Sequence, residues 1–265
     1  MKIYEICDEE NEMSVGTLLY FEKEKSYIIE LQDDLDEWTA PLLLSSFVKK
    51  GVYTIPSSIS LLWVKERVIP TGRQNINSIL ETHKLKEYDE NSFLEISEGK
   101  CSQDMLYIRK INSLPAYVMK RARRNITECT IVEGNQLLCF FADDTVKKAD
   151  ISKWTDLDDI NRVVNNQMVF ESVKVGTGGY SITFNDSIEV SARLLWDRGK
   201  LIPLTPNDFL SFVRRNVLDT SECCEILECS RQNLSYLVKE KSLNPIKENV
   251  KGNLYLKGDI LRNRW

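Results

Sequence analysis

Histidine is almost missing from this chain of 265 residues, in which His83 is the only one. Most Ser-His and Cys-His nucleophile arrangements need a histidine as the base, so His83 would have to serve in any of them. It stands between Thr82 and Lys84 in a charged stretch, where we expect an exposed position. The scarcity argues against an enzyme, and we predict no catalytic residues.

Cysteine pairs at metal-binding spacing are also missing. The seven cysteines form no Cys-x-x-Cys pair and their number is odd, whereas structural zinc needs four sulfur or nitrogen ligands at short paired spacings. We therefore expect no metal site and no other cofactor, and we interpret the thiols as reduced and mostly buried. They are Cys7, Cys101, Cys129, Cys139, Cys223, Cys224 and Cys229.

Long apolar runs are absent as well. None approaches the ~20 residues that a membrane-spanning helix needs. Residues 1–5 do not begin the order of charged, then apolar, then small residues that a signal peptide has. We therefore expect a cytoplasmic protein with no membrane partner. The chain is 42% hydrophobic and 28% charged, as is typical of a soluble globular protein. Its length leaves room for two or three small domains.

Near the C-terminus, two short helical patterns flank a tight turn. Asp219 can cap the first helix, and Glu222, three residues later, completes a capping box. Ser230 offers an N-cap for the second helix, whose leucines fall on one face. After a short loop, residues 246–256 predict two strands around a turn at Gly252-Asn253.

The other face of the second helical pattern has the composition of a DNA-recognition helix. Arginine reads guanine, and glutamine or asparagine reads adenine, each through two hydrogen bonds in the major groove. From residue 229 to the end there are eight Lys or Arg and three Asp or Glu, a local charge of +5 in a chain of −5. Such an excess favours phosphate binding. The predicted DNA contacts are Ser230, Arg231, Gln232, Asn233, Ser235 and Tyr236, with Lys239, Lys247, Lys251 and Asn253 on phosphates.

This order of helix, turn, helix and hairpin resembles the excisionase and MerR-like winged helix-turn-helix family over about residues 215–265. The resemblance implies a double-stranded DNA operator as partner and a homodimer on two half-sites. The alternative is a small helical cap whose polar face is only solvated. The first helix is acidic, so its carboxylates should face away from DNA or toward another domain; they are Asp219, Glu222, Glu225 and Glu228.

The first 116 residues predict a hairpin, residues 15–21 and 27–31, and then helices that start near Ser57 and at Asn75. Their order resembles the small N-terminal subdomain of HipA-family kinases. The matching segments are Val15-Gly16-Thr17-Leu18, Pro41-Leu42-Leu43-Leu44-Ser45, Ile69-Pro70-Thr71-Gly72-Arg73, Leu85-x-x-Tyr88-Asp89-x-x-x-Phe93-Leu94 and Gly99-Lys100-Cys101.

The kinase core that follows this subdomain in HipA proteins is missing here. The sequence contains no glycine-rich phosphate loop followed by a lysine strand, and no Asp-Phe-Gly type cluster. In some systems of the family the subdomain is a separate polypeptide that restrains a kinase toxin, so the resemblance implies a protein-binding module with a HipA-like kinase as partner. The alternative is a scaffold domain with a structural role.

Residues 117–204 predict strands at 126–132, 136–141, 145–151, 170–175 and 180–184, with a helix at 155–165. The hairpin at residues 137–146, Asp150, and Gly179-Tyr180-Ser181-Ile182-Thr183-Phe184-Asn185-Asp186-Ser187-Ile188 through Leu195 resemble a small bacterial domain of unknown function, number 2442. The resemblance implies an α+β unit and little chemistry. A glycine cluster at 176–179 has no Lys-Ser or Lys-Thr after it, so we interpret it as a hairpin loop. The basic run at 119–124 is interpreted as a linker or helix end, with nucleic-acid contact as the alternative.

The sequence as a whole therefore predicts an α+β protein of two small α+β modules, residues 1–116 and 117–204. A linker helix, with Thr205 as its cap and Pro206 in its first turn, and a winged helix-turn-helix are expected to follow in residues 205–265. The predicted function is that of a bacterial DNA-binding transcriptional regulator, an antitoxin or autorepressor of a HipA-like kinase toxin. The alternative is a protein-interaction scaffold without DNA binding.

Overall fold

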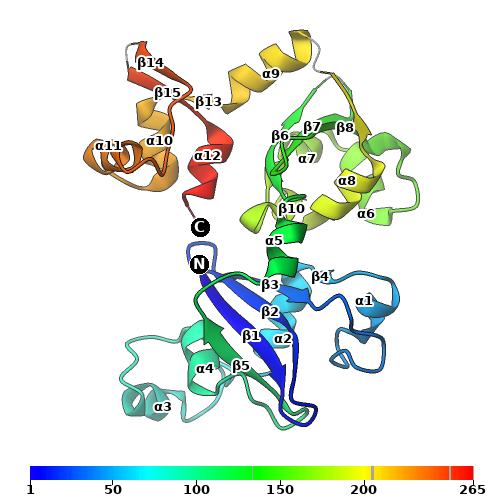
Figure 1. The fold of residues 1–265 in the computed structure, drawn as a ribbon, viewed down its shortest axis with the longest axis vertical. Helices are drawn as coiled ribbons and strands as arrows, with labels where there is room; N and C mark the ends of the chain where they lie inside the picture. Colours follow the sequence, from blue (N-terminus) through cyan, green and yellow to red (C-terminus); the bar gives the residue numbers. More distant parts are fainter. Residues whose placement is uncertain (133, 204–205, 251, 265) are drawn as a thin grey trace. The chain divides into compact units, whose positions relative to one another are not determined.

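The computed structural model describes residues 1–132, 134–203, 206–250 and 252–264 (Figure 1). The chain divides into two compact units, Met1–Lys120 and Arg121–Trp265. Both combine helices with antiparallel strands, so the fold is a mixture of α and β structure as predicted. Among the described helices, none has both the length and the apolar character required to cross a bilayer.

A five-stranded antiparallel sheet in the order β4-β3-β2-β1-β5 forms the centre of the first unit. The middle strand, β2, is buried along most of its length because it has a neighbour on each side and is covered by helices. At Gly16 a Cβ atom would lie 2.5 Å from the carbonyl oxygen of Glu30, so only glycine fits there. The strands are β1 (Lys2–Asp8), β2 (Met13–Phe21), β3 (Ser26–Leu31), β4 (Thr54–Ile55) and β5 (Leu106–Ile111).

The helices of this unit supply the large side chains of its core. Trp63 of α2 and Phe93 of α4 are almost completely buried together with the apolar residues of β2 and β3. Helix α4 starts at Asp89, whose carboxylate accepts the Ser92 N–H at 2.8 Å. The helices are α1 (Ser45–Lys49), α2 (Ser57–Lys65), α3 (Ile76–Thr82), α4 (Glu90–Ile96) and α5 (Ala116–Ala122), which runs past the point where the units divide.

The predicted hairpin and the two predicted helices of this unit are confirmed as β2, β3, α2 and α3. Strands β1 and β5 and helix α4 were not predicted from the sequence. Strand β1 pairs with β5 from Ile3 opposite Ile111 to Asp8 opposite Leu106. Because these strands are about a hundred residues apart, no local pattern connects them.

The second unit begins with two antiparallel sheets, in the orders β12-β8-β7-β6 and β11-β10-β9. They share one core, in which Phe170 and Phe184 are fully buried. The strands are β6 (Ile126–Ile131), β7 (Gln136–Phe141), β8 (Val146–Asp150), β9 (Lys174–Val175), β10 (Ser181–Phe184), β11 (Ile188–Ser191) and β12 (Lys200–Leu201). The helices are α6 (Asp158–Val164), α7 (Gln167–Glu171) and α8 (Ala192–Arg198).

The predicted strand at residues 170–175 is largely wrong. Asn166 accepts the N–H groups of Met168 and Val169, at 3.1 and 3.3 Å, and so starts α7 where the apolar run suggested extended chain. Only the last two residues form a strand, β9. The glycine cluster joins β9 to its antiparallel neighbour β10, so its interpretation as a hairpin connection is confirmed.

The remainder of the unit is a helical segment with a small three-stranded sheet in the order β13-β15-β14. Helix α9 packs on the preceding sheet, with the ring of Phe212 4.4 Å from that of Phe140 and Lys148 paired with Asp208 at 3.5 Å. The predicted Thr205 cap of α9 lies outside the described residues. The elements are α9 (Pro206–Asn216), β13 (Val217–Leu218), α10 (Thr220–Leu227), α11 (Arg231–Lys239), β14 (Lys247–Val250), β15 (Gly252–Leu256) and α12 (Lys257–Arg262).

Candidate functional site

Helix α10 begins with the predicted capping box, which is confirmed. The Asp219 carboxylate accepts the N–H groups of Ser221 and Glu222 at 2.7 and 2.9 Å, and the Glu222 carboxylate accepts the Asp219 N–H at 2.8 Å. This reciprocal pair satisfies backbone donors that the first turn of a helix leaves open. The start of α10 is therefore fixed by residues of its own.

Helix α10 ends in a left-handed residue, Glu228, with φ of 52°. The Cys229 N–H donates to the carbonyl of Cys224 at 3.1 Å, and the Glu228 N–H donates to that of Glu225 at 3.3 Å. These two bonds form a Schellman motif, which closes a helix and redirects the chain. The Ser230 hydroxyl then accepts the Asn233 N–H at 3.2 Å and starts α11 as predicted.

The two faces of α11 are as different as the sequence indicated. Leu234 is 1% exposed and packs with Cys223 and Leu227 of α10, so this side of α11 is held against the core of the segment. The opposite side is solvent-facing. All the predicted contact residues on it are exposed: Ser230, Arg231, Gln232, Asn233, Ser235, Tyr236 and Lys239.

Few protein groups compete for the exposed side chains of α11. Arg231 donates from Nη2 to the Ser221 hydroxyl at 3.1 Å, and the Ser235 hydroxyl donates to the Arg231 carbonyl at 3.0 Å. Within the described part of the chain, the side chains of Gln232 and Tyr236 make no hydrogen bond or ion pair. The amide and the phenol are thus open to a ligand, and Arg231 is held by one exposed hydroxyl.

The hairpin after α11 carries the remaining predicted residues. Lys247 is exposed at the start of β14, and Asn253 is half-buried in β15, where its amide donates to the Tyr255 hydroxyl at 3.4 Å. Lys251 lies outside the described residues. The two predicted strands are confirmed, but the expected turn at Gly252 is wrong, because Gly252 already belongs to β15 and pairs with Val250.

Several basic side chains near this segment were not among the predicted contacts. Arg214 and Arg215 are exposed in the last turn of α9, and Lys241 is exposed two residues after α11 at φ of 58°. The local excess of Lys and Arg was the signal that could have included Lys241. The acidic residues of α10 that the sequence set apart are also exposed.

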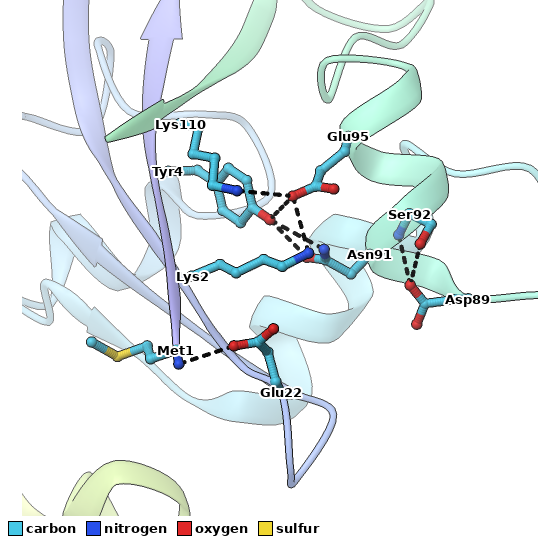
Figure 2. Close-up of polar contacts among 9 residues, drawn as sticks. All are labelled: Met1, Lys2, Tyr4, Glu22, Asp89, Asn91, Ser92, Glu95 and Lys110. Atoms are coloured by element: carbon cyan, nitrogen blue, oxygen red, sulfur yellow. Dashed lines mark hydrogen bonds and ion pairs between the residues drawn. The ribbon is translucent and has the colours of Figure 1, made fainter. Parts of the chain in front are cut away.

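A second polar cluster lies in the first unit, between β1, β5 and α4 (Figure 2). The Tyr4 hydroxyl donates to Glu95 Oε1 at 2.6 Å, Lys2 reaches the same oxygen at 3.2 Å, and Asn91 donates to the Tyr4 hydroxyl at 3.1 Å. Partial burial opposes ionisation of Glu95, but the hydrogen bonds from Tyr4 and Lys2 hold its pKa below the usual value. These groups form hydrogen bonds with one another, so the cluster connects α4 to the sheet.

Metal-binding side chains do not gather in the described residues: no three or more His, Cys, Asp or Glu lie together in a suitable arrangement. Comparisons of the chain with protein-family models, curated proteins and solved structures give no match. The three family resemblances therefore stay predictions from the sequence. The exposed face of α11 is the site that the geometry favours.

Proposed function

We propose that α10, α11 and the β14–β15 hairpin form a winged helix-turn-helix that binds duplex DNA, and that the chain is a bacterial transcriptional regulator. The observation that supports this most is the exposed polar face of α11, on which Arg231 and Gln232 stand in the first turn while Leu234 is buried. Recognition helices place such residues at their N-terminal end, where they meet base edges.

On this proposal α11 lies in the major groove, which is wide enough for one helix. Arg231 donates both guanidinium arms to a guanine, and Gln232 pairs with an adenine. The Arg231 bond to Ser221 is exchanged for the base contact at little cost because both side chains are exposed. Ser235 and Tyr236 follow along the same face and contact bases or sugars.

Lysines around this face would provide the contacts to phosphate. Lys239 ends α11 and Lys247 starts the hairpin, and both are exposed. Lys251 and Asn253 are assigned the same role on the wing. Two copies on two half-sites would double the number of phosphates neutralised, which is how a small module reaches useful affinity.

For the first unit we propose a protein-binding role, with a HipA-like kinase toxin as partner, so that the chain is an antitoxin or autorepressor. The support is the sequence resemblance of residues 1–116. A second candidate, a protein-interaction scaffold, draws on the exposed acidic residues of α10, since Glu225 and Glu228 would repel phosphate if they faced it.

The test is the affinity of the full chain for a fluorescent duplex as salt is varied. We expect log K to fall linearly with log salt, and a variant with Lys239→Ala and Lys247→Ala to show a slope shallower by about one unit for each lysine removed. Lys23→Ala, an exposed lysine of the first unit, is the matched control and should change nothing. Absence of duplex binding even at low salt would favour the scaffold.

A further inference from the structure

We propose that Cys224 and Cys229 are a reversible thiol–disulfide site at the turn between α10 and α11. Both are free and both are partly exposed. One lies in α10 and the other directly precedes Ser230, the N-cap of α11. This site does not depend on DNA binding, because it is defined by the two thiols and the turn that connects them.

The Schellman motif brings the two side chains together. In such a turn the residues at its two ends commonly make an apolar contact, and here both ends carry a thiol. The backbone bond of 3.1 Å from the Cys229 N–H to the Cys224 carbonyl holds the ends together. Burial raises the pKa of the Cys224 thiol, and the neighbouring Cys229 thiol raises it further through charge and a hydrogen bond. The two cysteines therefore stand at the two ends of one backbone hydrogen bond, which brings their backbones together as disulfide closure requires.

The chain contains a second close pair, which shows what else a redox site needs. Cys129 and Cys139 face each other on β6 and β7 with their sulfur atoms 3.8 Å apart, but they are only 8% and 1% exposed. Thiol exchange needs a thiolate that a reagent can reach. The hydrogen bond with Cys139, together with burial, raises the pKa of Cys129 well above its usual value. Proximity without access leaves this pair inert.

The other thiols are poorer candidates. Cys223, next to Cys224 in sequence, is completely buried. Cys101 is partly exposed, but its thiol donates to the Asp104 carboxylate at 3.5 Å, and the next cysteine in the sequence, Cys129, belongs to the buried pair. At Cys224 the positive charge of Arg231 opposes the effect of burial, although the pKa of that thiol stays raised. Cys224 and Cys229 are therefore the pair in which two partly exposed thiols stand at the ends of one turn.

A small disulfide is the oxidant. One of the two cysteines gives its thiol proton to solvent, and its thiolate attacks one sulfur of the reagent, whose S–S bond breaks to release the first small thiolate. The other cysteine loses its thiol proton in turn, attacks the protein sulfur of the mixed disulfide and expels the second small thiolate. Both small thiolates take up protons. Two protein thiols are oxidised to one disulfide, and one small disulfide is reduced to two thiols.

The experiment uses the full-length folded protein and oxidised glutathione. After incubation, the remaining thiols are alkylated without unfolding and the linkages are mapped by mass spectrometry. We expect a Cys224–Cys229 link that a reducing dithiol reverses, while Cys129 and Cys139 become alkylated only after unfolding. Wild-type protein in which no Cys224–Cys229 link appears, or in which glutathione stays attached to both thiols, would overturn the proposal.

Single-residue variants show which two sulfur atoms form the disulfide. Cys224→Ser and Cys229→Ser should each abolish the link, and Cys101→Ser, a partly exposed cysteine elsewhere, should leave it intact. A link that persists in Cys224→Ser would show that Cys223 is the partner and would contradict the assignment. Melting temperatures of the reduced variants, compared with reduced wild type, show whether each is folded when it is mapped.

Discussion

Tyr4 in the first unit and Gln232 near the C-terminus both carry hydrogen-bonding groups on regular elements, but their surroundings differ. Tyr4 is 1% exposed and its hydroxyl is engaged by Glu95 and Asn91. Gln232 is exposed, and its amide has no partner among the described residues. Most buried polar groups form hydrogen bonds within the protein, whereas exposed polar groups can form hydrogen bonds with a ligand.

The cores behind these side chains differ as well. The first unit has a five-stranded sheet in which most of β2 and β3 is buried, together with Trp63 and Phe93 of the helices that pack on it. The segment that carries α11 has a small core around Cys223, Leu234 and Tyr255. The contrast indicates that the first unit uses its side chains mainly to hold itself together, while α11 uses one face for packing and leaves the other available.

The largest effect is expected in the core of the first unit. Trp63→Ala should lower the free energy of unfolding by about 3–5 kcal/mol, because it removes a large buried ring and the Arg67 guanidinium that lies 3.7 Å from it loses its contact. Denaturant unfolding measures this. The neighbouring Leu62→Ala, at a side chain 44% exposed, should cost clearly less. Equal losses would mean that the ring is not the centre of this core.

A buried carboxyl in the second unit provides a pH-dependent test of the difference between buried and exposed polar groups. Glu128 is 4% exposed, and in the described structure its Oε2 has no hydrogen-bond partner. Burial raises its pKa from 4.5 to about 7, although the charge of Lys257 opposes this. The folded state then holds more protons than the unfolded state between these values, so stability should fall as pH rises from about 4.5 to 7.

Glu128→Gln should therefore raise the free energy of unfolding by about 3 kcal/mol above pH 7 and change it little below pH 4.5. Denaturant unfolding at the two pH values measures the difference. Glu95→Gln is the matched comparison with the opposite sign, because the pKa of Glu95 is held low and its charge stabilises the fold at neutral pH. A Glu128→Gln effect that does not vary with pH would contradict the buried-acid account.

On α11 we expect substitutions of exposed residues to weaken DNA binding without lowering the stability of the fold. Arg231→Ala and Gln232→Ala should each weaken specific duplex binding by about 1–3 kcal/mol, while the free energy of unfolding changes by less than about 0.5 kcal/mol. Fluorescence anisotropy and denaturant unfolding measure the two quantities. Gln167→Ala, at an exposed glutamine of α7, is the control. If the α11 variants lose stability and keep their affinity, the exposed face has a structural role.

The smallest effect concerns the helix caps, where the two regions should behave alike. Asp219→Ala, at the N-cap of α10, removes a carboxylate that accepts two backbone N–H groups, and Asp89→Ala, at the N-cap of α4, removes one that accepts the Ser92 N–H. Each should lower the free energy of unfolding by about 1 kcal/mol, as is typical for the loss of an N-cap. Denaturant unfolding of both variants tests this. A much larger loss at either site would indicate a tertiary role beyond capping.

The features predicted correctly are those with a local cause. The capping box at Asp219, the cap at Ser230 and the β2–β3 hairpin each depend on residues close in sequence. The missed strands β1, β5 and β13 form by pairing with distant partners, which periodicity cannot reveal. The strand predicted at 170–175 failed because the Asn166 cap outweighed the β-branched residues that follow.

In the candidate site, too, the features that could be predicted were those determined by residues close in sequence. Exposure of the polar face of α11 could be predicted from the spacing of its leucines, since a helix that buries one face must expose the other. The Arg231 bond to Ser221 and the partial burial of Asn253 could not, because they depend on how α10 and β15 pack.

The most direct test of the central claim is selection of bound sequences from a random duplex library by the full-length protein, followed by the same selection with Arg231→Ala. The account predicts a short enriched sequence, and loss of preference at one guanine in the variant. No enriched sequence, or the same sequence enriched by both proteins, would contradict it.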